Sequence, residues 1–159
     1  MLFSSDGFML RAAAVDLGTV NTLIAVKGQG IILREPSAVA IRTQDEREIV
    51  AVGRDALEIS GKTPGGVSVV WPLREGVIAD GALAAEMLRR FMAKALRRKN
   101  GVLGRRLAMC MPLGVTKIER AALEEAAKAA GAREVLMIDE PVAAAFGANL
   151  PAGEPRGTL

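Results

Sequence analysis

The sequence has no histidine, no tyrosine and a single cysteine, Cys110. Without histidine, a Ser-His-Asp triad, a Cys-His pair and a metal site built on histidine are all excluded. One cysteine cannot form a disulfide within the chain. Because Cys110 lies in the apolar run LAMCMP, we expect it to be a small buried side chain rather than a nucleophile.

The chain also lacks a long apolar run, since no stretch approaches the roughly eighteen residues that a membrane-spanning helix requires. Half of the 159 residues are hydrophobic and a quarter are charged, which is the composition of one globular domain. In the opening stretch MLFSSDGFMLR the basic residue follows the apolar ones, the reverse of the order in a secretory signal. We therefore expect a cytoplasmic protein.

Aromatic residues are scarce, with one tryptophan and four phenylalanines. The formal net charge is +3, and the shortage of aromatics limits which partners this positive charge can bind. Residues 89–106 hold eight of the 21 basic residues and no acidic one, so the rest of the chain carries a net charge of −5. The basicity is one local patch. We expect no nucleic acid partner, because such a patch would need aromatic side chains on which bases stack.

Hydrophobic periodicity predicts an α/β fold with a mixed sheet, in which a β-meander is followed by strand, helix, strand and helix. The turn-forming clusters GTVN and KGQG separate the strands of the meander. Asp80 is placed to cap a long helix that ends near Asn100, and Thr116 with Glu119 forms a capping box for a second helix. The expected strands are 12–17, 21–27, 30–34, PSAVAIRT, REIVAVG, RRLAMCMP and REVLMID. The expected helices are GRDALEIS, 80–100, KIERAALEEAAKAAG and EPVAAAFGAN, and VSVVWPLREGVIAD is expected to be an extended connection.

The first turn of the meander, within AVDLGTVNTLIAV, carries residues suited to binding phosphate. Asp16 interrupts an apolar strand, and a buried carboxylate is costly unless it is paired or holds a cation. Gly18 allows close approach of a ligand to the backbone, and Thr19, Val20 and Asn21 offer successive N–H groups, with Asp16 facing Mg²⁺ through water. The alternative is that Asp16 only caps a tight hairpin. An Asp16 side chain turned into bulk solvent would argue against the metal role.

A second pair of acids, Asp139 and Glu140, lies in MIDEPVAAAFGAN, where a strand ends and a helix begins. A carboxylate at this position can orient a water molecule for attack on a terminal phosphate, which is largely a positioning task. The alternative is electrostatic, because an acid at a helix N-terminus gains about 0.3–1 kcal/mol from the helix dipole. Neither short motif decides the function by itself.

Taken with the sequence between them, the two motifs resemble the MreB-type bacterial actins, the family of rod-shape-determining proteins. The similar stretches are DLGTVNTLIAVKGQGIILREPSAVAI, WPLREGVIAD and MCMPLGVTKIERAALEEAAKAAGAREVLMIDEPVAAAFGANL, which together reach from about residue 12 to the C-terminus. Chaperone, sugar-kinase and cell-division ATPases share both short motifs, but PLREGVIAD and REPSAVAI resemble MreB. Two small departures, Glu75 where the family usually has Asp and Val20 where Ala is common, remove no reactive group.

The resemblance implies the N-terminal half of the actin-like ATPase architecture, which is a ribonuclease H-like fold. Residues 1–34 and 80–159 would form subdomain IA, and residues 35–79 would form the smaller subdomain IB. The implied cofactors are ATP and Mg²⁺. Glu140 would be the catalytic acid that positions the hydrolytic water. The first phosphate loop would comprise Asp16, which also holds Mg²⁺ through water, Gly18, Thr19, Val20 and Asn21.

The resemblance also implies filaments of the protein itself, peripheral at the inner surface of the cytoplasmic membrane, that direct cell shape together with the cell-wall elongation machinery. In the basic run, NGVLG places Val102 and Leu103 at a glycine-flanked turn that suits an anionic bilayer. Phe3 and Phe8 in the N-terminal segment would form a second membrane contact. The alternative is a solvated helix face whose turn is fixed to the core by Leu103.

The family implies more chain than this sequence contains. Its members continue with a second phosphate loop of Asp-x-Gly-Gly-Gly-Thr type and a second domain that carries the adenine site, whereas this sequence stops at Leu159. We therefore expect weak or absent ATP binding and no meaningful ATPase turnover by this chain alone. Two other functions stay open, a sugar-kinase or chaperone-type ATPase relative and a non-catalytic cap or regulator of full-length filaments.

Overall fold

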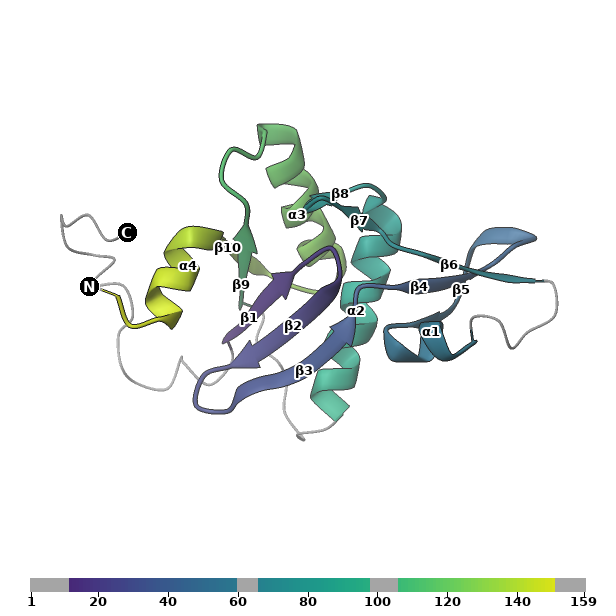
Figure 1. Cartoon of the computed structure of the whole chain (residues 1–159), viewed down its shortest axis with the longest axis horizontal. Coiled ribbons are helices and arrows are strands. Elements are labelled where there is room, and N and C mark those ends of the chain that lie inside the picture. Colours follow the sequence, from purple (N-terminus) through teal and green to yellow (C-terminus); the bar gives the residue numbers. More distant parts are fainter. Residues whose placement is uncertain (1–11, 60–65, 98–105, 151–159) are drawn as a thin grey trace.

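The computed structural model describes residues 12–59, 66–97 and 106–150, which form ten strands and four helices (Figure 1). The strands are β1 (Ala12–Leu17), β2 (Asn21–Val26), β3 (Gly30–Pro36), β4 (Val39–Arg42), β5 (Asp45–Val52), β6 (Val67–Val70), β7 (Leu73–Arg74), β8 (Val77–Ile78), β9 (Arg106–Met111) and β10 (Glu134–Asp139). The helices are α1 (Arg54–Ile59), α2 (Gly81–Arg97), α3 (Lys117–Ala129) and α4 (Glu140–Gly147). None of the helices in these ranges is long and apolar enough to cross a membrane.

The larger sheet has five strands in the order β10-β9-β1-β2-β3. β1, β2 and β3 form an antiparallel meander, while β9 pairs with β1 in parallel and β10 pairs with β9 in parallel. The chain reaches β9 after α2 and β10 after α3, so each parallel pairing follows a helix, as parallel strands require. The predicted meander and mixed α/β sheet are confirmed.

A smaller sheet, in the order β5-β4-β6, is followed by the β7–β8 hairpin. The expectation of a single extended connection over VSVVWPLREGVIAD is wrong, because β6 pairs with β4 and β7 pairs with β8. The hairpin turn places Glu75 at φ 51° and Gly76 at φ 79°. Two consecutive residues of positive φ are typical of a tight hairpin, which the short pairing strands did not reveal in sequence.

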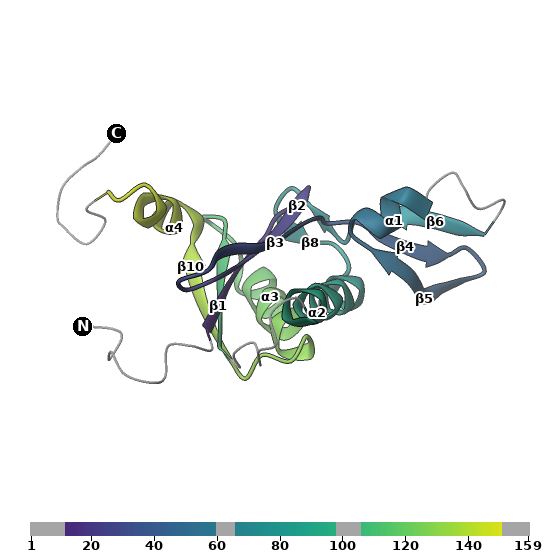
Figure 2. The same ribbon diagram turned by 90° about the horizontal axis from the view of Figure 1, so that it is seen from below.

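Helices α2 and α3 cover one face of the larger sheet, and α4 lies on the other side (Figure 2). Met87, Leu88 and Phe91 of α2 are fully buried in the core, and each such side chain stabilises the fold by about 1.5–3 kcal/mol. The other face is partly open: α4 buries none of its residues, and Leu136 and Phe146 are exposed. This open face borders the candidate site.

The predicted helix starts are confirmed. Leu83 N–H donates to Asp80 Oδ1 at 2.9 Å, and Thr116 and Glu119 form the reciprocal capping box. These bonds satisfy N–H groups that the first turn of a helix leaves without a partner. The predicted end of the first long helix, near Asn100, lies outside the described residues.

Glu35, at the end of β3, joins the larger sheet to α1 and α2. Its carboxylate is buried, yet it lies 2.8 Å from Lys94 Nζ and accepts a hydrogen bond from Arg54 N–H at 2.9 Å. Burial raises the pKa of Glu35, but the bonds from Lys94 and Arg54 outweigh it and hold the pKa below its ordinary value. Gly53 lies against this group at φ +68°, where a Cβ would be 2.6 Å from Glu35 Oε2 and 2.9 Å from Phe91. The junction therefore requires glycine at this position.

Replacing Gly53 by alanine should destabilise the fold by about 2–4 kcal/mol, because it adds a steric clash to backbone strain. The matched control is Gly28→Ala, since Gly28 has φ +76° and open space around its missing Cβ. It should cost only the strain, about 1–2 kcal/mol. Urea denaturation measures both variants. Equal losses would show that Glu35 and Phe91 move aside freely, contrary to this account.

Candidate functional site

The candidate site lies where the parallel strands β1, β9 and β10 end. The register sets Val15 of β1 beside Met109 of β9, and Cys110 of β9 beside Ile138 of β10. β1 continues to Asp16, and β10 runs directly into Glu140, the first residue of α4. The carboxyl ends of parallel strands are where open α/β sheets place ligands. The sheet thus brings Asp16 and Glu140, which are far apart in the sequence, to the same end of its parallel strands.

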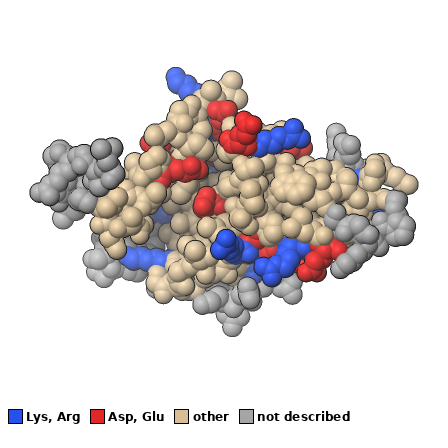
Figure 3. Space-filling view, viewed as in Figure 1, with Lys and Arg blue, Asp and Glu red and all other residues tan. Residues whose placement is uncertain are grey.

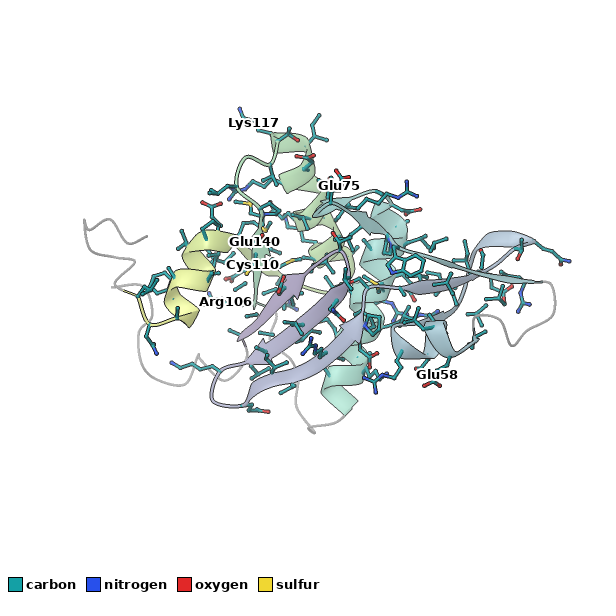
Figure 4. All side chains as sticks on the ribbon, in the orientation of Figure 1. Glu58, Glu75, Arg106, Cys110, Lys117 and Glu140 are labelled. Carbon is teal, nitrogen blue, oxygen red and sulfur yellow. The ribbon has the colours of Figure 1, made fainter. Side chains whose placement is uncertain are left out.

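Cys110 is on β9, between the strand that carries Asp16 and the strand that leads into Glu140. Burial raises the pKa of its thiol, and the negative charges of Asp16 and Glu140 raise it further. The strand order agrees with this effect, because β9 lies between β1, which carries Asp16, and β10, which leads into Glu140. Figure 4 shows the side chains of Cys110 and Glu140 close together. The expectation that Cys110 is not a nucleophile agrees with this raised pKa, although the side chain is half-buried rather than fully buried.

Asp16 is solvent-exposed, so the expectation of a buried carboxylate is wrong. The side chains of β1 alternate between the core and the open face, and Asp16 lies on the open face with Ala12 and Ala14. The strand is apolar on both faces because alanine occupies the exposed positions. By the criterion given in the sequence analysis, this exposure argues against the metal role of Asp16. Its negative charge nevertheless helps to raise the pKa of the Cys110 thiol.

The turn between β1 and β2 is held by backbone and hydroxyl groups. Gly18 N–H donates to Asn21 C=O at 3.2 Å, and Ser37 N–H donates to Val20 C=O at 2.9 Å. The Ser37 hydroxyl donates to Gly18 C=O at 2.6 Å and lies 2.9 Å from the Thr22 hydroxyl. Thr22 and Ser37 are fully buried. The sequence interpretation missed both residues, and the available signal was a serine inside the apolar run PSAVAI.

The turn needs a glycine for its own geometry, because a Cβ on Gly18 would lie 2.8 Å from Asn21 C=O. Val20 is the most exposed residue of the turn, with 68% of its surface accessible. Thr19 Oγ1 accepts a hydrogen bond from Gly76 N–H at 2.8 Å, which ties the turn to the β7–β8 hairpin. The structure therefore gathers the predicted loop residues 18–21 next to Asp16, with Glu140 across Cys110.

Within the described ranges, no group of three or more His, Cys, Asp or Glu side chains is arranged to hold a metal ion. A cation bound beside Asp16 would therefore take few ligands from these residues. Mg²⁺ suits such a place, because it usually keeps several waters and binds through one or two carboxylates together with phosphate oxygens. The residues present fit a magnesium ion that binds with a nucleotide.

The basic run 89–106 is partly neutralised in space by acids from elsewhere. Bonds from Arg89 and then Arg90 lower the pKa of Glu86 to about 2, although partial burial opposes them. Ion pairs are formed by the basic side chains of this run that the structure describes: Arg89 and Arg90 with Glu86, Lys94 with Glu35, and Arg106 with Glu134. The predicted membrane contacts Val102, Leu103, Phe3 and Phe8 lie outside the described residues.

Replacing Thr19 by valine should expose the Gly76 amide to faster hydrogen exchange, by about two- to tenfold, because one hydrogen bond is worth about 0.5–1.5 kcal/mol. Valine keeps the shape of threonine but offers no acceptor. Thr19→Ser, which keeps the hydroxyl, is the matched control and should retain protection. NMR measures the exchange rate of this amide. Unchanged protection in the valine variant would mean that the bond to Thr19 does not hold the hairpin.

Comparisons with known proteins agree with the resemblance described above. The family model of the MreB/Mbl protein matches residues 11–159. The chain is 45% identical over 163 residues to the cell shape-determining protein MreB of Escherichia coli (strain K12), a match that covers 100% of this chain and 47% of that protein. The chain thus spans about half the length of the curated relatives it matches.

Solved structures show the same relationship. The crystal structure of MreB5 of Spiroplasma citri bound to ADP matches with a TM-score of 0.77 and 36% identity, covering 93% of this chain and 44% of that one. MreB5 bound to AMPPNP matches with a TM-score of 0.76 and 35% identity over the same shares. These matches confirm the predicted N-terminal half of the actin-like architecture. Since the family model covers nearly the whole sequence, the chain belongs to the MreB/Mbl family.

Proposed function

We propose that this chain is the phosphate-binding part of a bacterial actin-like cytoskeletal protein that directs cell shape. One observation carries the proposal: Asp16 and Glu140 flank Cys110 at the end of β1, β9 and β10, beside the turn that follows Asp16. Membership of a family of cell shape-determining proteins supports the biological role. The ligands ADP and AMPPNP in the MreB5 structures support a nucleotide as the bound molecule.

In this proposal the β1–β2 turn binds the phosphates. Gly18 N–H is already used within the turn, so we assign the phosphate contacts to the N–H groups of Thr19 and Val20 and to the side chain of Asn21. Thr19 Oγ1 accepts from Gly76, which leaves the hydroxyl hydrogen of Thr19 free to donate to a phosphate oxygen. Preorganised donors of this kind bind an anion without further ordering of the backbone.

The two carboxylates take different roles. Asp16 would hold Mg²⁺ through water, and the ion would supply positive charge to the phosphates. Glu140 would position a water molecule by accepting its hydrogen bond, a role that requires an exposed carboxylate facing the phosphate end of the ligand. The exposed position of Glu140 at the start of α4 supports this assignment.

The two-sheet organisation supports a division into two subdomains. The five-stranded sheet is built from residues 12–36 and 106–139, and the three-stranded sheet from residues 39–70. We therefore propose residues 1–34 and 80–159 as one subdomain and residues 35–79 as the other. The phosphate site belongs to the larger one.

Titration of the 159-residue chain with Mg-ATP tests the nucleotide proposal. We expect calorimetry to give a Kd weaker than about 1 μM, and NMR shift changes to concentrate in residues 16–21 and around Cys110 and Glu140. Asp16→Asn should weaken Mg-ATP binding by about tenfold without affecting ATP in the absence of magnesium, because it removes the charge that faces the ion.

Glu58→Gln is the matched control, since it removes one negative charge from α1 (Figure 4). It should bind Mg-ATP like the unmodified chain. Shift changes confined to other regions would contradict the proposed site. Micromolar or tighter binding would contradict the expectation that this chain alone binds weakly.

We further propose that the protein assembles with itself at the inner membrane surface and works with the cell-wall elongation machinery. Family membership supports self-association. Four basic residues of the run, Arg97, Arg98, Lys99 and Arg105, surround NGVLG in the sequence. Each contributes about 1 kcal/mol near an anionic bilayer, and Val102 and Leu103 would insert between the headgroups. Phe3 and Phe8 would add the second contact.

Sedimentation with phosphatidylglycerol vesicles tests the membrane contact, and sedimentation without vesicles reports self-association. Replacing Val102 and Leu103 by serine should release the protein from vesicles, since shallow insertion of apolar side chains is lost. Leu113→Ser with Ile118→Ser is the control, because these two apolar residues are 68% and 82% exposed elsewhere on the surface. If vesicle binding persists after Val102 and Leu103 are replaced, or if the control variant loses it equally, the proposed membrane contact is wrong.

A further inference from the structure

A cavity of about 980 Å³ lies apart from the candidate phosphate site and shares no residue with it. It is a groove bordered by β3, the end of β5, the start of α1 and one side of α2. Its volume is at the upper end of the range of about 300–1,000 Å³ that ligand sites usually occupy. The proposed nucleotide function makes no use of this groove.

Two sheet edges line the groove. β3 is the outer strand of the larger sheet and β5 is an outer strand of the smaller one. Consecutive residues of each strand, 33–35 and 50–52, line the cavity, which means that the backbone edge itself faces it. Ile49 C=O of β5 already accepts a hydrogen bond from the Arg90 guanidinium at 3.0 Å. A donor in the groove can therefore reach the backbone carbonyl groups at the edge of β5. The outer edge of β3 has no neighbouring strand in the larger sheet, so its backbone can pair with another strand.

The charges around the groove leave a positive surplus. Its lining contains five basic residues and two acidic ones. Arg89 and Arg90 pair with Glu86, and Lys94 pairs with Glu35 and lies 3.6 Å from Asp55. Among the side chains that the structure describes, the ion pairs of this region use neither the Arg34 nor the Arg54 guanidinium, although the charge of Arg54 also helps to lower the pKa of Glu35. Figure 3 shows basic side chains along this lower edge, between β3 and α1, with acidic side chains beside them.

We propose that the groove binds an extended acidic segment of a partner protein. The backbone of the segment pairs with the edge of β3, and its carboxylates pair with Arg34 and Arg54. Its alternate side chains contact the exposed apolar residues Val50 and Ala93. Three features select this partner: an unpaired strand edge recognises an extended backbone, arginine recognises carboxylate with two parallel hydrogen bonds, and an apolar wall accepts every second side chain.

The probe is a short fluorescent peptide of alternating glutamate and valine, measured by anisotropy with the whole chain. We expect it to bind, and the same peptide with lysine in place of glutamate to fail. Arg34→Glu with Arg54→Glu should weaken binding by at least about tenfold, because each substitution places like charges together. Lys117→Glu with Arg120→Glu makes the same change of net charge on α3, away from the groove, and should leave binding intact.

Methylating the peptide backbone nitrogens at alternate positions should abolish binding if the segment pairs as a strand, and retained affinity would overturn that mode. Near-ultraviolet circular dichroism of Trp71 checks that the variants fold. Equal loss in the two double variants would show that net charge alone attracts the peptide. Phosphatidylglycerol vesicles that bind through Arg34 and Arg54 and displace the peptide would identify a lipid headgroup site and overturn the protein partner. The test needs no nucleotide, so its result does not depend on whether the proposed phosphate site is correct.

Discussion

The candidate site depends on the parallel register of β9 between β1 and β10. Leu107, Met109 and Met111 alternate into the core, and Cys110 lies between them on the open face. A slip of one residue would expose all three apolar side chains, each of which stabilises the fold by about 1.5–3 kcal/mol when buried. Core packing therefore fixes the strand ends that carry Asp16 and Glu140, although neither acid takes part in that packing.

Buried hydroxyls hold the turn in place on this framework. Thr22 and Ser37 lie in the core, where an unsatisfied hydroxyl costs about 1–3 kcal/mol. They satisfy each other and the Gly18 carbonyl, which joins the turn to the connection after β3. The bond from Gly76 to Thr19 joins it to the β7–β8 hairpin. The turn is therefore fixed by segments from three places in the chain.

The features that could be predicted from sequence are those that depend on neighbouring residues. The meander, the Asp80 cap and the Thr116 capping box follow from local spacing, and the structure confirms them. The roles of Thr22 and Ser37 depend on contacts between different strands, which periodicity does not encode. The exposure of Asp16 was missed for a related reason, because an alanine-rich strand does not reveal which of its faces the helices cover.

The electrostatics of the site explain why the proposed function includes a cation. Asp16, Asp139 and Glu140 all lie near the strand ends, so a phosphate placed there meets negative charge. Two like charges 4 Å apart repel by about 4 kcal/mol at an effective dielectric constant of 20. The neutral N–H groups of one turn offset only part of this repulsion. In the proposed function, a divalent cation bound together with the phosphates would make the charge of Asp16 favourable to binding. Asp16 would hold this ion, and the ion would supply positive charge to the phosphates.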